Sequence, residues 1–340
     1  MTQARAGLSV AVVGATGAVG EALLSVLVER NFPITKLHAL GRKKASDYSA
    51  MFNERPVRIE IVDDFDFAQC QIAFFCAPKA VAKKHAPRAA KSGCWVIDVS
   101  SQFRLDKDVP LVVPEINADI LAALSKPQII ASPSAPVIQA CSALFPVQQK
   151  FGLRRIDITT LLAVSALGKA GVTELAGQTA RLLNVQAIEQ KLFPAQIAFN
   201  LLPTFDAATE SGYTIEESNG PQEVKRLLQA NQLEVVMSQA FAPVFYGHSQ
   251  IVRVETIENC AVQQVRKLLT TAGLEFPDSP EESLSPVSIG TASDTVFISR
   301  CLQQRADSQQ LELWTVADNI RKGAAINSVS IAEALLKTHL

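Results

Sequence analysis

Three glycines near the start of the chain follow an apolar run and have the spacing of a nucleotide-binding turn. They lie in the segment Gly14-Ala15-Thr16-Gly17-Ala18-Val19-Gly20. Glycines between a strand and a helix permit a tight turn, close approach of the backbone to a pyrophosphate and close helix packing, and the helix N-terminus favours negative charge. A turn without a ligand is the alternative. Its position in the first strand–helix unit favours a dinucleotide site.

The next predicted strand ends in cations and carries no acidic residue, in the order Ala39-Leu40-Gly41-Arg42-Lys43-Lys44. A site for NAD usually places Asp or Glu there to bind the ribose hydroxyl, whereas cations accommodate a 2′-phosphate. Arg42 and Lys43 are therefore predicted to contact NADP(H). The alternative is a solvated basic loop.

A second corner of interest begins at the apolar run Gln128–Ala131. The run breaks at Ser132-Pro133-Ser134, and an amphipathic stretch opens at Ala135. This order predicts a strand, a turn and a helix N-terminus, where backbone N–H groups lower the pKa of a thiol and stabilise an oxyanion. In this chain Ala135 places only a methyl group at this helix N-terminus. Cys141 lies almost two helical turns downstream and is predicted to pack in the core.

The apolar pattern predicts the strands and helices that would hold these two turns in place. Strands are expected at 8–13, 36–39, 57–62, 72–75, 95–98 and 128–131, with helices at about 18–30 and 80–91. Such alternation predicts right-handed βαβ units and a mostly parallel sheet. Longer strand-like runs follow at 155–165 and 250–255, with a helix at 172–183 and a surface loop at 276–286, which indicates a second, α+β domain. The last segment, 319–336, is predicted to be helical.

Six short motifs occur in one order along nearly the whole chain. They are Gly14–Gly20, Asp98-Val99-Ser100-Ser101-Gln102-Phe103-Arg104, Val113-Pro114-Glu115-Ile116-Asn117, Ala163-Val164-Ser165-Ala166-Leu167-Gly168-Lys169-Ala170-Gly171, Tyr246-Gly247-His248-Ser249, and the stretch from Asp318 to Asn327. Together they resemble the aspartate-β-semialdehyde dehydrogenase family. The resemblance implies a Rossmann-type doubly wound α/β domain (1–133 plus 319–340) and an α+β catalytic-like, dimerisation domain (134–318), as in the glyceraldehyde-3-phosphate-dehydrogenase-like fold.

The resembled enzymes act through a thiolate, which attacks the aldehyde before hydride passes to NADP and phosphate releases an acyl phosphate. The family's Asn-Cys pair falls on Ser134-Ala135, so the nucleophile is lost by this resemblance. Leu162 stands at the position of a Gln near the reacting centre. Phe241 stands where an arginine binds the substrate carboxylate, and Asn219 stands where a lysine helps to hold phosphate.

Other family residues are kept. By resemblance, His248 is the general base, Arg104 contacts phosphate or substrate, and Glu217 faces the substrate. Gly168, Lys169 and Asn319 are predicted to bind the cofactor. His38, His85 and His339 lie outside the motifs and are expected to be ordinary surface or interface residues. The kept residues can also be explained as a fold-specifying pattern inherited without activity.

Composition limits the remaining function classes. At 340 residues two domains are expected, and a net charge of −1 argues against a nucleic-acid partner. The first residues resemble neither a signal peptide nor a membrane span, so we expect a cytoplasmic protein without a membrane partner. The six cysteines show no paired metal spacing, so no metal site is predicted and the thiols are expected to be reduced and buried.

Three hypotheses follow. The leading one is a catalytically impaired paralogue of aspartate-semialdehyde dehydrogenase, similar to the Usg-type homologues, that keeps the fold, the homodimer and NADP binding. The second is a non-covalent NADPH-dependent carbonyl oxidoreductase acting on a more apolar substrate, since Leu162 and Phe241 make the pocket less polar while His248 remains. The third is a scaffold or partner subunit that forms a heterodimer with an active homologue.

Overall fold

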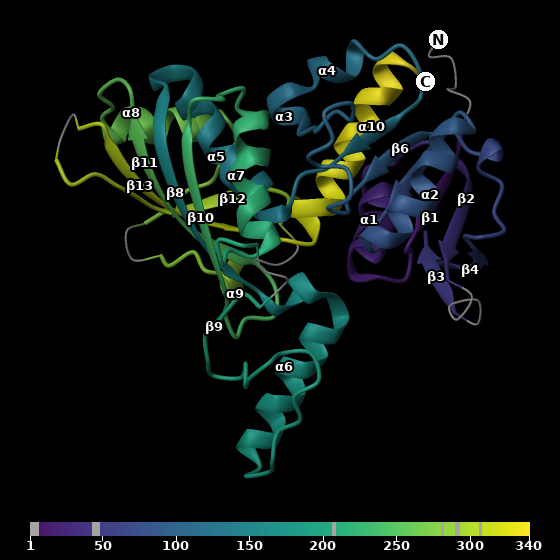
Figure 1. The fold of residues 1–340 in the computed structure, drawn as a ribbon, viewed down its shortest axis with the longest axis horizontal. Coiled ribbons are helices and arrows are strands. Elements are labelled where there is room, and N and C mark those ends of the chain that lie inside the picture. Colours follow the sequence, from purple (N-terminus) through teal and green to yellow (C-terminus); the bar gives the residue numbers. More distant parts are fainter. Residues whose placement is uncertain (1–6, 43–47, 206–208, 280–281, 290–292, 306–307) are drawn as a thin grey trace. The chain divides into compact units, whose positions relative to one another are not determined.

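The computed structural model describes residues 7–42, 48–205, 209–279, 282–289, 293–305 and 308–340 (Figure 1). They form two compact units: the described residues up to Ser134 together with 324–340, and those from Ala135 to Gly323. The domain boundaries expected from the sequence, 133/134 and 318/319, stay a prediction, because compactness alone does not define where a functional domain ends.

The first unit is a seven-stranded sheet with the strand order β3-β4-β2-β1-β5-β6-β7, parallel throughout except for the β3–β4 pair. Its elements are β1 (Leu8–Val13), α1 (Ala18–Glu29), β2 (Ile34–Gly41), β3 (Ser49–Phe52), β4 (Arg55–Ile61), η2 (Phe67–Gln69), β5 (Ile72–Phe75), α2 (Lys79–Lys91), β6 (Trp95–Asp98), α3 (Pro114–Asn117), α4 (Asp119–Ala122), β7 (Ile129–Ala131) and α10 (Asn327–Thr338). The predicted parallel α/β sheet is confirmed.

Strand β1 shows why this sheet is covered on both faces. Val10 and Val12 point into one core with α1 and α10, whereas Ala11 and Val13 point into a second core with α2. Side chains of a strand alternate between faces, so the unbroken apolar run from Val10 to Val13 requires helices on both sides. The last helix, yellow in Figure 1, supplies Val329 and other residues to the first core, as the resemblance implies.

The second unit is a mixed six-stranded sheet in the order β12-β13-β11-β8-β10-β9. Its elements are α5 (Ala135–Phe151), β8 (Leu153–Leu162), η3 (Val164–Leu167), α6 (Gly168–Leu183), β9 (Leu202–Pro203), α7 (Ile215–Leu227), β10 (Glu234–Phe241), β11 (His248–Thr256), α8 (Val262–Thr271), α9 (Pro286–Ile289), β12 (Val296–Leu302) and β13 (Gln310–Ala317). The π-helix η4 (Arg321–Ile326) includes the boundary between the units, which falls after Gly323. Figure 1 shows α6 projecting beyond the end of this sheet.

Only one face of the second sheet is covered by α5 and α7. Gln139 of α5 bonds to the buried Thr315 of β13, and Gly220 of α7 lies against the Met237 side chain of β10. The opposite face of the sheet carries Asp157 of β8, which is half-buried, and Arg253 of β11, which is exposed. The sheet therefore has an inner face that packs on helices and an outer face that ends in polar side chains.

Candidate functional site

Three residues singled out from the sequence lie at one end of three neighbouring strands. Leu162 ends β8 and pairs in register with Phe241, which ends β10. His248 begins β11, whose next residue, Ser249, pairs with Leu161. The strand order β11-β8-β10 therefore brings His248, Leu162 and Phe241 together although they are far apart in the sequence.

His248 is buried, and its ring is held by the main chain. Nδ1 accepts a hydrogen bond of 3.1 Å from the backbone N–H of Ala163, and the His248 carbonyl accepts one of 3.3 Å from the Gln139 side chain. Burial lowers the pKa of His248 to about 3, because an apolar surrounding disfavours the imidazolium. The imidazole is therefore neutral at neutral pH.

Asn319 organises the loop that precedes His248. Its side-chain oxygen accepts hydrogen bonds from the Gly247 N–H at 3.0 Å and from the Ser165 hydroxyl at 3.1 Å. Asn319 is itself buried. This oxygen already accepts two hydrogen bonds within the unit, so Asn319 positions the turn that leads to His248. The predicted contact of Asn319 with the cofactor stays a prediction.

Ala135 is the first residue of α5, at a helix N-terminus as predicted. Its methyl group lies close to Gly323 of the π-helix, because a Cβ built on Gly323 would fall 2.5 Å from the Ala135 Cβ. The first turn of α5 is fixed by Gln250, whose side chain donates to the Pro136 carbonyl at 2.8 Å and to the Thr160 hydroxyl at 3.2 Å. The helix N-terminus is thus rigidly held, and it presents no nucleophile at its first position.

Leu162 and Phe241 belong to one apolar cluster. Phe241 packs edge-to-face on Phe193 and tilted on Phe205, with ring centroids 5.4 Å apart in each pair. Leu162 and Leu202 join the same buried cluster. Phe241 therefore fills space at this end of the sheet, and the site has no guanidinium at this position.

Glu217 and Asn219 lie on α7. One carboxylate oxygen of Glu217 accepts from the N–H and the hydroxyl of Thr214, and the other accepts from the Gln239 N–H at 2.8 Å. Thr214 in turn caps the Glu217 N–H, which is a capping box. Glu217 thus anchors α7 to β10, whereas Asn219 is half-buried on the same helix. Their predicted substrate and phosphate contacts are not tested by these bonds.

Gly168 and Lys169 begin α6, directly after the 3₁₀ turn η3. Gly168 has a φ of +72° and open space around its Cα, whereas a Cβ on Gly171 would fall 2.2 Å from the Val164 carbonyl oxygen. The glycines therefore shape this turn. The Lys169 side chain is exposed.

The glycine-rich turn of the first unit has the form that the sequence predicts. Gly14 has a φ of +86°, and a Cβ on Gly20 would fall 2.2 Å from the Gly14 carbonyl oxygen. Gly17 is the N-cap of α1 and, as a glycine, makes no side-chain hydrogen bond to the first turn. N–H groups at a helix N-terminus suit a phosphate. The turn from Gly14 through Ala15, Thr16, Gly17, Ala18 and Val19 to Gly20 therefore fits a dinucleotide.

Arg42 follows the last residue of β2, which is the strand beside β1 in the sheet. Because the carboxyl ends of parallel strands share one edge, Arg42 and the glycine-rich turn lie on the same side of the sheet. Lys43 lies outside the described residues.

Arg104 is buried within the first unit. Nε donates to the Ser132 carbonyl at 3.1 Å and one terminal nitrogen donates to the Val99 carbonyl at 2.7 Å. The nearby Asp98 is fully buried, and burial raises its pKa to about 6 although Ser100 bonds to both oxygens. Arg104 thus ties together the loops after β6 and β7, and its contact with phosphate or substrate stays a prediction.

His38 and His85 were expected to be ordinary surface or interface residues, and a surface position is wrong for both. His38 and His85 are both buried, and His38 Nδ1 lies 2.7 Å from a Glu60 oxygen. Burial lowers the pKa of His85, which lies 3.4 Å from an Asp63 oxygen. Each of these two histidines pairs with a carboxylate. The spacing of the residues in the sequence does not reveal these pairs.

The thiols are free, as expected, and five of the six are buried. Burial raises the pKa of Cys141, so this thiol is unreactive at neutral pH. Among the described residues, no group of three or more His, Cys, Asp or Glu side chains is arranged to hold a metal ion. None of the helices described combines the length and apolar character that crossing a membrane requires.

Sequence reasoning missed the residues that hold the site in place. Gln250 and Gln139 fix the first turns of α5 to β11, and Ala163 orients the imidazole. A signal for Gln250 existed, because it lies two positions after His248 and thus on the same face of the strand. Ala163 acts through its backbone and leaves no signal in residue type.

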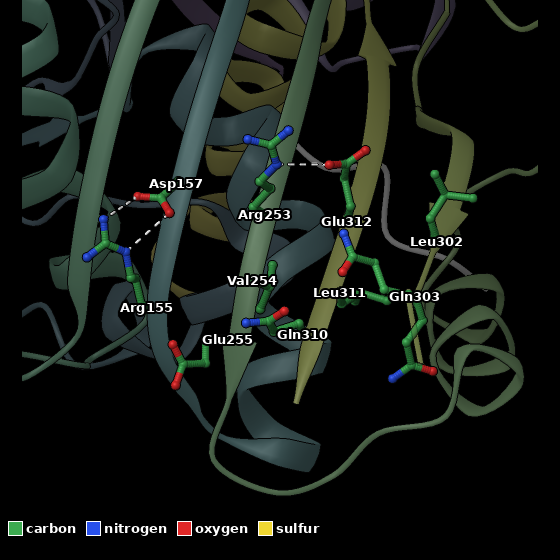
Figure 2. Close-up of a pocket in the computed structure, with 11 residues that line it drawn as sticks. Arg155, Asp157, Arg253, Val254, Glu255, Leu302, Gln303, Gln310, Leu311 and Glu312 are labelled. Atoms are coloured by element: carbon green, nitrogen blue, oxygen red, sulfur yellow. Dashed lines mark hydrogen bonds and ion pairs between the residues drawn. The ribbon is translucent and has the colours of Figure 1, made fainter. Parts of the chain in front are cut away.

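A cavity of about 470 Å³ lies on the outer face of the second sheet, away from these residues. Figure 2 shows its side chains rising from neighbouring strands, with Arg155 bonded to Asp157 and Arg253 bonded to Glu312. The Arg253–Glu312 distance is 2.9 Å. These charges are paired with one another, so the cavity lacks the unpaired cation that an anionic ligand would need.

Comparison with known proteins identifies the family. A model described as the NAD-binding domain of semialdehyde dehydrogenase matches residues 9–124, and one described as its dimerisation domain matches 144–322. An aspartate-semialdehyde dehydrogenase of Shewanella violacea is 43% identical over 332 residues, covering 97% of this chain and 98% of that protein. A USG-1 protein homolog of Pseudomonas aeruginosa is 40% identical over 338 residues, covering 98% and 99%.

The fold agrees with these matches. The structure of aspartate semialdehyde dehydrogenase II from Vibrio cholerae, complexed with ASA, superposes with a TM-score of 0.94 at 40% identity, covering 98% of this chain and 99% of that one. The predicted glyceraldehyde-3-phosphate-dehydrogenase-like fold and the nicotinamide-nucleotide domain are confirmed. The chain therefore belongs to the aspartate-semialdehyde dehydrogenase family.

Proposed function

We propose that this chain binds NADP(H) but does not catalyse the phosphate-dependent interconversion of aspartate semialdehyde and aspartyl phosphate. The observation that carries the proposal is Ala135 at the first position of α5. The reaction needs a thiolate there to form the covalent intermediate, and a methyl group cannot form it. Neither Ser132 nor Ser134 is a substitute, since a hydroxyl needs a paired base, and the Ser132 hydroxyl already accepts a bond of 2.8 Å from Asn327.

The surroundings support the same conclusion. Phe241 packs against Phe193 and Phe205, so this position offers the substrate carboxylate an apolar ring instead of a guanidinium. Leu162 offers no hydrogen bond, and Asn219 carries no charge for phosphate. Loss of the nucleophile is thus accompanied by loss of the groups that would bind its substrates.

The nucleotide site is the part that we propose to be active. The turn from Gly14 to Gly20 would hold the pyrophosphate on the N-terminus of α1, and Arg42 would contact the 2′-phosphate that distinguishes NADP from NAD. When bound, the nicotinamide supplies or accepts a hydride. The end of β2, which precedes Arg42, carries no acidic residue that would repel the 2′-phosphate.

The homodimer is also proposed, with the outer face of the second sheet as the contact surface. The dimerisation-domain match spans 144–322, which includes the whole of this sheet. Across the strands the outer face alternates in charge, with Asp157 beside Arg253 and Arg253 beside Glu312. Half-buried Ile251 and Trp314 lie next to one another in the same face. Alternating charges around an apolar strip form a self-complementary surface, as a two-fold interface requires.

A test of the proposal measures both properties on the purified protein. Calorimetry should show NADPH binding with a Kd of about 1–100 μM, and Arg42→Ala should weaken it about tenfold while leaving NADH binding unchanged. Arg58→Ala, an exposed arginine of β4, is the matched control and should bind like the wild type. With aspartate semialdehyde, phosphate and NADP, the wild type should give no NADPH above buffer. Phosphate-dependent NADPH formation would overturn the loss of activity, and absent binding would overturn the nucleotide site.

A further inference from the structure

The end of β2 is held by two backbone hydrogen bonds that meet at the residues just before Arg42. The Gly14 N–H donates to the Leu40 carbonyl at 2.8 Å, and the Val62 N–H donates to the Gly41 carbonyl at 3.0 Å. The first bond joins β2 to the glycine-rich turn, and the second joins it to the segment after β4. The position of Arg42 therefore depends on both neighbours.

The segment after β4 lies near the edge of the sheet. Among the described residues, β3 pairs only with residues 55–58 of β4, so the carboxyl end of β4 has no strand on its outer side. Gly41 has no side chain to pack, so the Val62 N–H is its hold on this segment. Main-chain carbonyls inside a protein are nearly always bonded, so those after β4 need donors from outside the sheet.

Arg88 of α2 supplies these donors. One terminal nitrogen donates to the Val62 carbonyl at 2.6 Å, and the other donates to the Asp63 carbonyl at 2.9 Å. The guanidinium also lies over the Phe67 ring, with its central carbon 5.2 Å from the ring centroid. A planar group that makes two hydrogen bonds and an aromatic contact is fixed in orientation, so it clamps the segment after β4 in place.

The Asp63 side chain is turned towards the same helix. Its carboxylate forms an ion pair with Lys84 and lies 3.4 Å from His85 Nε2. The hydrogen bond from Lys84 lowers the pKa of Asp63, so the carboxylate is ionised at neutral pH. The acid of the clamped segment therefore faces α2, where the positive charges of Lys84 and Arg88 offset its own.

We propose that Arg88 is a positioning residue for NADP(H) that acts through Arg42. Arg88 holds Val62, and Val62 in turn holds Gly41, so the end of β2 can present Arg42 to the 2′-phosphate. The inference rests on the proposed function and deepens it, because it adds a determinant of the preference for a 2′-phosphate. A merely structural tie between α2 and β4 would affect NADPH and NADH alike, since the glycine-rich turn binds the pyrophosphate that both share.

The first experiment tests the clamp without nucleotide. Amide hydrogen exchange in the full-length, ¹⁵N-labelled protein is followed by NMR for the wild type and for Arg88→Met, which keeps an apolar stem over Phe67 and removes both donors. We expect the Val62 amide to exchange about tenfold faster in the variant, and the Gly14 amide on the other side of β2 to keep its wild-type rate. Equal exchange of the Val62 amide in both proteins would overturn the inference.

Calorimetry then tests the link to the nucleotide. Arg88→Met should raise the Kd for NADPH about fivefold and leave the Kd for NADH within about twofold of the wild-type value. Arg88→Lys keeps the charge and one donor group, so it should recover part of the affinity. Arg30→Met is the matched control, because Arg30 also ties two elements of this unit, through Ser330 and Glu333 of α10, and should change neither Kd. Equal weakening of both nucleotides by Arg88→Met would contradict the inference.

A double-mutant cycle tests whether Arg88 acts through Arg42. In an Arg42→Ala background, Arg88→Met should weaken NADPH binding no further, because the residue that it positions is already gone. Additive losses would show that Arg88 acts independently of Arg42, against the inference. A wild type that binds neither nucleotide would contradict the proposed function and with it the role in NADP(H) binding, whereas the exchange of the Val62 amide would still decide on the clamp.

Discussion

Single residues in both units carry protonation properties that their types do not suggest. Asp98 is fully buried and its pKa is raised to about 6, whereas the pKa of His248 is lowered to about 3. Both shifts have the same cause, because burial disfavours whichever form is charged. Their effects on stability therefore have opposite dependence on pH.

For Asp98 the linkage predicts lower stability at neutral pH. A carboxyl group with a raised pKa stabilises the fold below its unfolded value of 3.8, and this contribution is lost as the pH rises through about 6. A change of roughly two pKa units corresponds to about 2–3 kcal/mol. Asp98→Asn should therefore gain stability relative to the wild type by up to this amount between pH 4 and pH 7.5.

The measurement is urea unfolding of both proteins at several pH values, followed by Trp95 fluorescence. The chain has two tryptophans, Trp95 and Trp314, so a Trp314→Phe background leaves a reporter in the unit that contains Asp98. Acidification destabilises both proteins equally through His248, so the difference between them isolates Asp98. A difference that stays constant with pH would show that Asp98 remains charged in the folded protein.

At this scale the sequence singles out residues that lie together at strand ends, but it does not predict their contacts. Ala135, Leu162 and Phe241 could be found as departures from a motif, because a change of residue type is visible in the sequence. Glu217 and Arg104 keep the expected types, yet their polar atoms bond within their own units. Spacing along a chain does not reveal hydrogen-bond partners that are distant in sequence.

At the scale of elements, the alternation of strands and helices in the first unit was predictable and their ends less so, whereas β10, β12 and β13 of the second unit were not among the predicted strands. The strand expected to reach Ser165 ends at Leu162, because the Ala163 N–H turns to the His248 ring and η3 follows. The helix expected from Asn319 begins at Asn327, after the π-helix η4. The short edge strand β3 escaped prediction because its apolar alternation is only four residues long.

The start of α1 gives a prediction for an element. A Cβ at Gly20 would fall 2.2 Å from the Gly14 carbonyl oxygen and 2.9 Å from the Ala15 Cα, both of which are backbone. Gly20→Ala must therefore displace α1 from the glycine-rich turn. We expect a loss of about 1–3 kcal/mol, as for other overpacked sites, and at least tenfold weaker NADPH binding by calorimetry.

Gly177 in the middle of α6 is the matched control. No atom lies within 4 Å of a Cβ built there, so Gly177→Ala should add up to about 1 kcal/mol through helix propensity and leave NADPH binding unchanged. Wild-type nucleotide affinity in Gly20→Ala would mean that the close packing of α1 on the turn does not shape the site.

At the scale of the whole molecule, the outer face of the second sheet predicts a homodimer. Ile251 pairs with Trp314 on this face, and the buried neighbours of Ile251, Gln250 and Val252, point the other way. Ile251→Asp should leave the core intact while placing a charge in the apolar strip of the contact surface. Sedimentation equilibrium should find a dimer for the wild type and a shift towards monomer for the variant, with Kd raised at least 100-fold.

Val287→Asp, at an 81% exposed position on α9, should remain dimeric, because it adds the same charge outside the strip. If Ile251→Asp stays as dimeric as this control, the two-fold contact lies on another surface of residues 135–323.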